Sequence, residues 1–298
     1  MTINTARKIY LGFTLFCILT SSLRGLSQSS HNLPTFQLNH IDICIDSVSF
    51  NAILKNDFLR DSFAFVKVFT DSTGSEIMLL GKEFFIHLLP DKGFYENRLG
   101  ATLLVHHSFQ KQETKSLMEY LQSFTTDSLY NRPYTSKMNI DYINVYENLE
   151  KKDSLLKFIP ILQNWSTNDY LSWGYVHQDL QNGITQKKFM ADYVGKETES
   201  KLFKNVETIT VAVTKSEKGK MSVLLNAYGY KRKGSTYFLT GNPTVHLTEI
   251  KNRLRAIIVN ISLTKAMRKQ NVILSDKVSL TLKNKKASLQ YSIFENYH

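Results

Sequence analysis

The 298-residue chain has room for one large domain or two ordinary ones. Its formal net charge is +11, but the basic residues are scattered through alternating strand patterns and accompany no nucleic-acid motif, so we expect a solvated surface and no nucleic-acid partner. The two cysteines are Cys17, in an apolar N-terminal segment, and Cys44. A processed chain would therefore have no intrachain disulfide, and its stability would come from packing.

Residues 1–27 have the features of a secretory signal peptide. Two basic residues precede an apolar run over residues 9–19, and small residues stand at the cleavage-determining positions before Gln28. The run is shorter than the roughly 20 residues of a membrane span. We therefore expect export from a bacterial cytoplasm to the periplasm or the exterior, with no stable membrane anchor after cleavage. An uncleaved anchor is the alternative, and residues 28–35 form a polar leader.

Residues 36–46 predict a strand with two different faces. Ile41, Ile43 and Ile45 share one face, which is typical of a packed core. The second face combines a histidine and a carboxylate with two apolar side chains: Leu38, His40, Asp42 and Cys44. Because a half-buried strand normally turns solvated residues outward, this second face indicates a metal ligand or a proton carrier.

The next elements complete a unit of one strand, one helix and three strands. Asp46 can cap a helix that carries Phe50, Ile53 and Leu54 on one face. Strands are then predicted over three ranges, namely 63–69, 76–80 and 83–89. In the last of these strands, Phe85 and His87 share a face.

The same order of elements recurs along the chain, as a degenerate internal repeat. A second unit opens with a strand at 100–107 and a helix at 111–124, and closes with a predicted strand at 170–177 that aligns Trp173, Tyr175 and His177. A third opens at 206–213 and contains His246 in its last strand. A fourth opens at 254–263 and passes through a predicted short helix at 265–270.

These patterns predict an α+β fold of repeated βαβββ modules, paired into two cupped mixed β-sheets. We place the first module pair at residues 36–182, a connector at 183–203 and the second module pair at 204–298.

Two short segments, Leu38-Asn-His40 and Phe85-Ile-His87-Leu, resemble motifs of the vicinal-oxygen-chelate superfamily of glyoxalases and extradiol dioxygenases. The chain is also similar to exported bacterial glyoxalase-like proteins without an assigned function. The resemblance implies a metal site of two histidines and one or two glutamates, of which His40 and His87 match two positions. The expected glutamate is absent from the strand at 170–177, so His177 or Tyr175 could substitute, or Asp42 from beside His40.

The candidate site is therefore a divalent metal (Zn, Fe, Mn or Ni) held by His40, His87 and His177. The residues expected to line a pocket for a small oxygenated ligand are Leu38, Asp42, Phe85, Trp173 and Tyr175. The alternative is a non-catalytic ligand-binding or scaffold protein in which these histidines are hydrogen-bonded core residues. The sequence assigns no catalytic residue, substrate or oligomeric state, and it leaves open whether the protein is an enzyme.

Overall fold

The computed structural model describes residues 35–71, 74–92, 98–108, 113–123, 130–134, 140–144 and 157–294. The predicted signal peptide, and the leader apart from Thr35, lie outside these ranges. In the described part of the chain, no helix is long and apolar enough to cross a membrane.

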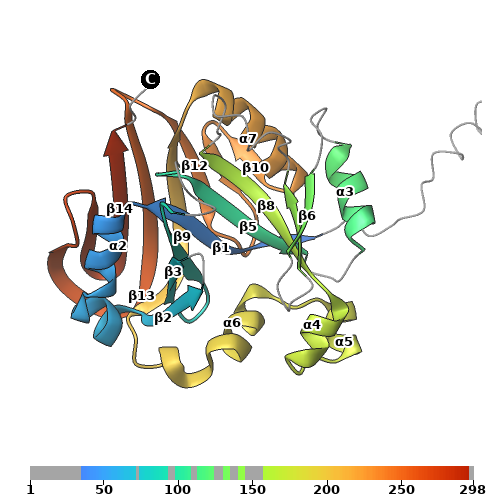
Figure 1. The fold of residues 1–298 in the computed structure, drawn as a ribbon, viewed down its shortest axis with the longest axis horizontal. Coiled ribbons are helices and arrows are strands. Elements are labelled where there is room, and N and C mark those ends of the chain that lie inside the picture. Colours follow the sequence, from blue (N-terminus) through green and yellow to red (C-terminus); the bar gives the residue numbers. More distant parts are fainter. Residues whose placement is uncertain are drawn as a thin grey trace, which may run out of the picture. The chain divides into compact units, whose positions relative to one another are not determined.

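The described chain is an α+β fold with two mixed sheets (Figure 1). The strands of the first sheet are β1 (Phe36–Ile45), β2 (Phe65–Asp71), β3 (Gly74–Leu80), β4 (Phe85–Pro90), β5 (Thr102–Ser108), β6 (Tyr130–Tyr134), β7 (Ile140–Asn144) and β8 (Phe158–Trp165). Those of the second are β9 (Phe203–Val213), β10 (Lys231–Lys233), β11 (Thr236–Phe238), β12 (Thr244–Glu249), β13 (Leu254–Ile273) and β14 (Val278–Phe294). The strand orders are β2-β3-β4-β1-β5-β8-β7-β6 and β10-β11-β12-β9-β13-β14.

Helices lie between the strands of each unit and between the two sheets in sequence. They are α2 (Ser47–Leu54), the π-helical η1 (Phe58–Phe63), α3 (Thr114–Gln122), α4 (Thr167–Ser172), α5 (His177–Asn182), α6 (Gln186–Val194), the 3-10 turn η3 (Gly195–Thr198) and α7 (Lys215–Ala227). The predicted cap of α2 is confirmed, because the Asp46 carboxylate accepts hydrogen bonds from the Val48 and Ser49 backbone N–H groups.

One strand order occurs three times. In each case a first strand is followed by a helix and three further strands, and the last strand returns to pair in parallel with the first: β1 with β4, β5 with β8 and β9 with β12. The predicted fourth unit is wrong in detail, because β13 runs unbroken through the expected helix at 265–270 and pairs with β14. Backbone pairing along this long hairpin outweighs the local helical preference of those residues.

The strand predicted at 170–177 is also wrong. Ser166 and Asp169 form a capping box that begins α4, and Gly174 beyond the helix adopts the left-handed conformation, with φ of 91°. The strand that closes the second unit is β8 instead, which lies earlier in the chain. Trp173, Tyr175 and His177 therefore do not share one strand face.

Strand β1 contains a β-bulge that reverses the side-chain alternation. Its register with β5 shifts between Leu38 and His40, so Asn39 is the extra residue. As a result, Phe36 and Leu38 lie in the same apolar core as Ile41 and its odd-numbered neighbours. The prediction that Leu38 lines a pocket beside His40 is therefore wrong.

The two sheets share this core, since its buried residues come from both. Backbone hydrogen bonds join them where Lys82 and Glu83 donate to the carbonyls of Phe203 and Lys204. The ring of Phe203 also stacks on that of Phe63. Strands β1 and β4 are therefore held in a rigid, densely packed setting.

Candidate metal centre

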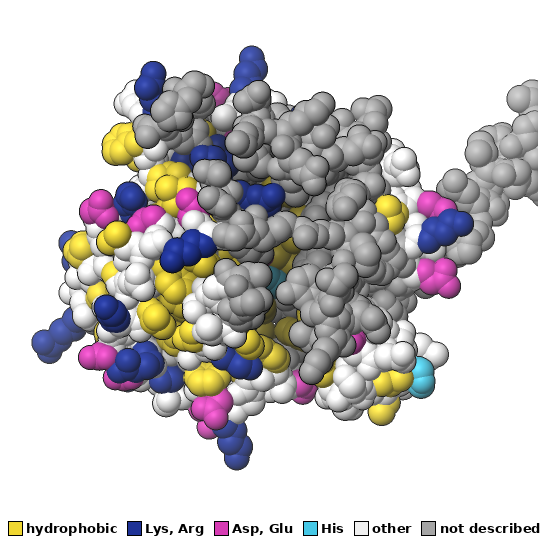
Figure 2. All heavy atoms as spheres, viewed as in Figure 1, with side chains coloured by type: hydrophobic (Ala, Val, Ile, Leu, Met, Phe, Trp, Pro, Cys, Tyr) yellow, Lys and Arg dark blue, Asp and Glu magenta, His cyan; other side chains and the backbone are white. Residues whose placement is uncertain are grey.

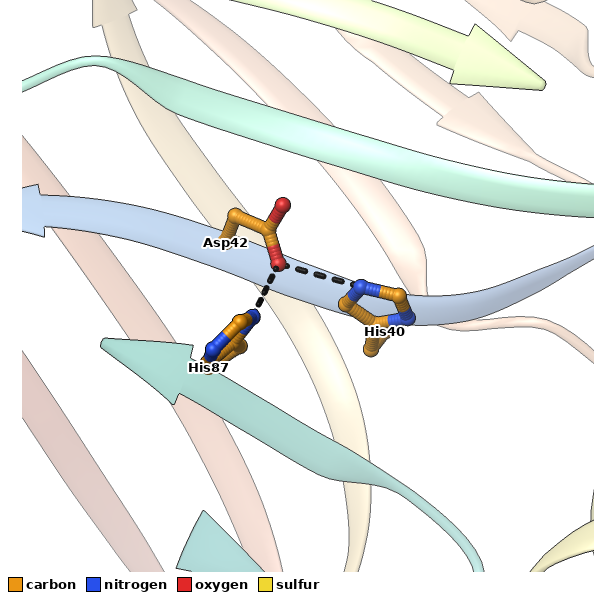
Figure 3. A group of neighbouring side chains, drawn as sticks. All are labelled: His40, Asp42 and His87. Carbon is orange, nitrogen blue, oxygen red and sulfur yellow. Dashed lines mark ion pairs between the residues drawn. The ribbon is translucent and has the colours of Figure 1, made fainter. Parts of the chain in front are cut away.

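Two adjacent parallel strands bring together His40, Asp42 and His87. The pairing of β1 with β4 sets His40 beside Phe85 and Asp42 beside His87. Figure 3 shows both imidazoles turned toward one oxygen of the Asp42 carboxylate. The distance to Asp42 Oδ1 is 3.0 Å from His40 Nε2 and 3.3 Å from His87 Nδ1.

These three side chains have the arrangement of a ligand group. One donor atom from each lies within 4.8 Å of the others, and the residues are only 7%, 7% and 9% exposed, in the order of the chain. Within the described residues, Asp42 Oδ1 has no hydrogen bond of acceptable geometry, despite the two nearby ring nitrogens. A buried carboxylate oxygen without a donor is costly, and a cation among these atoms would satisfy it.

The remaining nitrogen of each imidazole has a partner outside the group. His40 Nδ1 lies 2.6 Å from Asn39 Oδ1, and His87 Nε2 lies 3.1 Å from Glu76 Oε2. Histidines that bind metals usually donate their second N–H group to such an oxygen, which orients the ring. His40 Nε2 and His87 Nδ1 are the nitrogens left facing Asp42.

The electrostatics of the cluster balance burial against close opposite charges. Burial would raise the pKa of Asp42, but His40 and His87 outweigh it and hold this pKa well below its ordinary value. Burial disfavours charge on His87 as well, yet the nearby carboxylates of Asp42 and Glu76 raise its pKa to about 9. For His40 the effect of burial prevails over Asp42, and its pKa is lowered. Asp42 is thus a carboxylate ready to act as a ligand.

Apolar side chains surround the cluster. Phe85 stacks on the His40 ring with centroids 4.3 Å apart, and it belongs to an apolar cluster that includes Tyr175 and residues of α5 and α6. Figure 2 shows hydrophobic side chains gathered toward the middle of the visible face. Such surroundings lower the local dielectric and strengthen interactions with a bound ion or ligand.

Only some of the predicted site residues lie close together. Phe85 lies against His40, and Tyr175 is buried in the same apolar cluster as Phe85. Trp173 is 40% exposed and lies at the edge of that cluster, where its ring contacts those of Tyr170, Phe189 and Trp165. His177 is exposed at the first residue of α5 and does not belong to the ligand group. Its place as the third donor is taken by Asp42, because the segment that carries His177 is helical.

Sequence reasoning missed Glu76, Asn39 and Gln186. Glu76 lies in β3, two residues before Met78, which pairs with His87, so side-chain parity could have placed it near that histidine. The switch of the apolar pattern, from even positions up to Leu38 to odd positions from Ile41, could have revealed the bulge at Asn39. No local signal identifies Gln186, which comes from the predicted connector.

The group offers two imidazole nitrogens and one carboxylate oxygen. A metal ion bound by these three atoms would have coordination positions left for other ligands. This donor set suits zinc and the divalent ions of iron, manganese and nickel. The chemistry of the residues therefore fits a divalent metal that could also accept an outside ligand.

The comparison with known families covers nearly all of the described chain. Residues 38–291 match the model of a family of unknown function (DUF5829). No curated protein matches the chain. The matched range includes His40, Asp42, Glu76, His87 and Gln186 together with both sheets. The chain is therefore a member of the DUF5829 family.

Proposed function

We propose that this is an exported glyoxalase-like protein that binds a divalent metal, and with it a small oxygenated ligand, at the His40–Asp42–His87 group. The observation that carries the proposal is the convergence of His40 Nε2 and His87 Nδ1 on a buried Asp42 oxygen that has no hydrogen bond within the described residues. Since the second nitrogen of each imidazole already has an oxygen partner, the group is organised around the space between its three donors.

The strand order supports the glyoxalase-like part of the proposal. Two consecutive units, β1–β4 and β5–β8, have the order expected of βαβββ modules, and their opening strands pair antiparallel at the centre of the first sheet. The ligand group lies on the opening and closing strands of the first unit. In the resemblance to vicinal-oxygen-chelate proteins, these are the strands on which the metal histidines are expected.

The ligand class follows from the donors and their surroundings. A divalent metal at this site would polarise a carbonyl or stabilise an enediolate as a Lewis acid, and iron could in addition activate dioxygen. Phe85 covers one side of His40, and the apolar cluster around Tyr175 limits access of water. A small ligand with an oxygen donor and an apolar body suits these surroundings.

A second candidate is a non-catalytic scaffold or ligand-binding protein on the same fold. The observation that favours it is the charge balance around His87, which lies between Asp42 and Glu76 and has a pKa raised to about 9. A protonated His87 between two carboxylates would stabilise the strands without any metal.

Metal analysis of the purified full chain separates the two candidates. We expect one zinc or cobalt ion per chain after dialysis against limiting metal, and loss of this ion in His40→Ala and in His87→Ala. His177→Ala is the matched control, because that histidine is exposed and outside the group. Circular dichroism would establish that each variant is folded.

The outcomes differ clearly. Stoichiometric metal that is lost in the His40 and His87 variants and kept in the His177 variant supports the metal centre. A wild-type chain that binds no metal, with a lower melting temperature in the first two variants, supports the scaffold. Equal loss of metal in all three variants would contradict the proposed ligands.

A further inference from the structure

A buried chain of side-chain amides links the connector to the metal group. Gln186, the first residue of α6, is 8% exposed, and its Nε2 lies 2.6 Å from the main-chain carbonyl of Asn39. A carbonyl oxygen only accepts hydrogen bonds, so the NH2 end of the Gln186 amide must face it. The backbone N–H of Gln186 donates to Gln37 Oε1 at 2.7 Å, which anchors the start of α6 on β1.

The orientation of Gln186 determines that of Asn39. Since Nε2 of Gln186 is the donor, its Oε1 is an acceptor, and it lies 2.9 Å from Asn39 Nδ2. The NH2 end of Asn39 is therefore directed at Gln186, and its carbonyl oxygen is directed at His40. That oxygen lies 2.6 Å from His40 Nδ1, so Nδ1 carries the proton.

The same Asn39 amide orients a second imidazole in the opposite way. Asn39 Nδ2 also lies 3.2 Å from Nδ1 of His107, a buried residue of β5. An NH2 group only donates, so His107 Nδ1 is an acceptor and the proton of a neutral His107 is on Nε2. His40 and His107 are thus held in opposite tautomers by one side chain.

We propose that Asn39 and Gln186 are positioning residues that hold His40 with a proton on Nδ1 and a bare Nε2 turned toward Asp42. A nitrogen lone pair 3.0 Å from a carboxylate oxygen is favourable only with a cation between or beside them. The amide chain therefore makes the group receptive to a metal ion before the ion arrives. This inference rests on the metal centre proposed above.

Histidine tautomers can be read directly in the full chain without metal. In 15N-histidine-labelled protein, long-range 1H–15N spectra distinguish protonated from bare ring nitrogens. We expect a bare Nε2 for His40 and a bare Nδ1 for His107. Gln186→Met removes both amide contacts, and we expect a mixture of His40 tautomers with Zn²⁺ binding about 10- to 100-fold weaker. Gln178→Met, on an exposed helical surface, is the control and should change neither readout.

Asn39→Asp is a more specific test of how the Asn39 amide is oriented than removal of a side chain. A carboxylate only accepts hydrogen bonds, so His40 should keep its Nδ1 proton while His107 moves its proton to Nδ1. A merely structural role for Asn39 would not produce this split. Because the readout is spectroscopic, it also decides the matter if Gln186→Met does not fold.

A protonated His40 Nε2 in neutral wild-type protein would overturn the inference. So would a folded Gln186→Met variant with unchanged tautomers and unchanged Zn²⁺ affinity. If the wild type shows the expected tautomers but binds no metal, the metal centre fails while the hydrogen-bond assignment stands. The two proposals can therefore fail separately.

Discussion

The first unit of each sheet has an opening and a closing strand that pair in parallel, but the two pairs carry different side chains. In the first sheet, the parallel pair β1 and β4 sets Asp42 beside His87. In the second, the parallel pair β9 and β12 sets Thr210 beside His246. Both opening strands have a register shift, at Asn39 in β1 and at Glu207 in β9. Thr208 thus occupies the place of His40, and Thr210 that of Asp42.

The surroundings of the two histidines differ as well. His87 is buried against two carboxylates, whereas His246 is half-buried, with Nδ1 3.0 Å from the hydroxyl of Thr236. Glu207, at the second bulge, is exposed and pairs with Lys286 at the surface. The same strand pairing is therefore not sufficient to form a ligand group. Burial and two side chains of the right type are needed in addition.

The largest expected effect is a loss of Zn²⁺ affinity on substitution of Asp42, with no loss on the matched substitution of Thr210. Asp42→Asn replaces the only charged donor of the ligand group, and we expect Zn²⁺ affinity to fall by at least about 100-fold, more than for loss of an outer partner. Thr210→Val, the matched change in the second sheet, should leave the affinity unchanged. Isothermal titration calorimetry on both variants checks this, and similar losses in the two would contradict the assigned ligands.

The reverse experiment introduces the missing ligand side chains into the second sheet. In a chain with His40→Ala and His87→Ala, the changes Thr208→His and Thr210→Asp would complete a group with His246. We expect Zn²⁺ binding to return, about 10- to 100-fold weaker than at the native site, because His246 has the neutral hydroxyl of Thr236 as its partner where His87 has the Glu76 carboxylate. Absence of any binding would show that burial, which the second sheet lacks here, is decisive.

Acid stability tests the contact of His106, in β5, with Tyr228 at the end of α7. This fully buried ring stacks on Tyr228, its Nδ1 lies 3.0 Å from the Leu104 carbonyl, and burial lowers its pKa to about 3. The folded state therefore holds His106 neutral while the unfolded chain binds a proton below about pH 6.5. Its contribution makes the free energy of unfolding fall as the pH drops from 6.5 toward 3, by up to about 1 kcal/mol per pH unit.

His106→Phe should remove this part of the acid sensitivity, as measured by urea denaturation at pH 7 and pH 4.5. Buried His107, with a pKa lowered to about 4, adds a similar dependence that stays in the variant. Exposed His177→Phe is the control and should keep the wild-type slope. An unchanged slope in the His106 variant would show that its protonation is not coupled to unfolding.

The smallest expected effect concerns the approach of the two sheets at Gly81. A Cβ atom at this position would lie 2.6 Å from Phe203 Cδ2, and that ring is fully buried. We expect Gly81→Ala to lower the free energy of unfolding by about 1–3 kcal/mol in a single cooperative transition. Gly219→Ala, in open space within α7, should stabilise by about 0.5–1 kcal/mol. Two separate transitions would show that the sheets unfold independently.

Much of the fold could be predicted from local patterns. The strands around His40 and His87, and the helices after the first, second and third opening strands, follow from period-2 and period-3.6 alternation. The errors arose where another local signal or a long-range pairing decided the structure. The capping box at Ser166 and Asp169 turned a predicted strand into α4, and pairing with β14 extended β13 through a predicted helix.

The sequence by itself determined that His40, Asp42 and His87 come from strands of one unit, because alternation of side chains is a property of the local backbone. Only the tertiary structure decided which of them meet. The bulge at Asn39 sent Leu38 into the core, and the parallel register of β1 and β4 made Asp42 the third donor in place of His177. Gln186 reaches Asn39 across 147 positions of the chain, and such a contact has no local pattern because it depends on how distant elements pack.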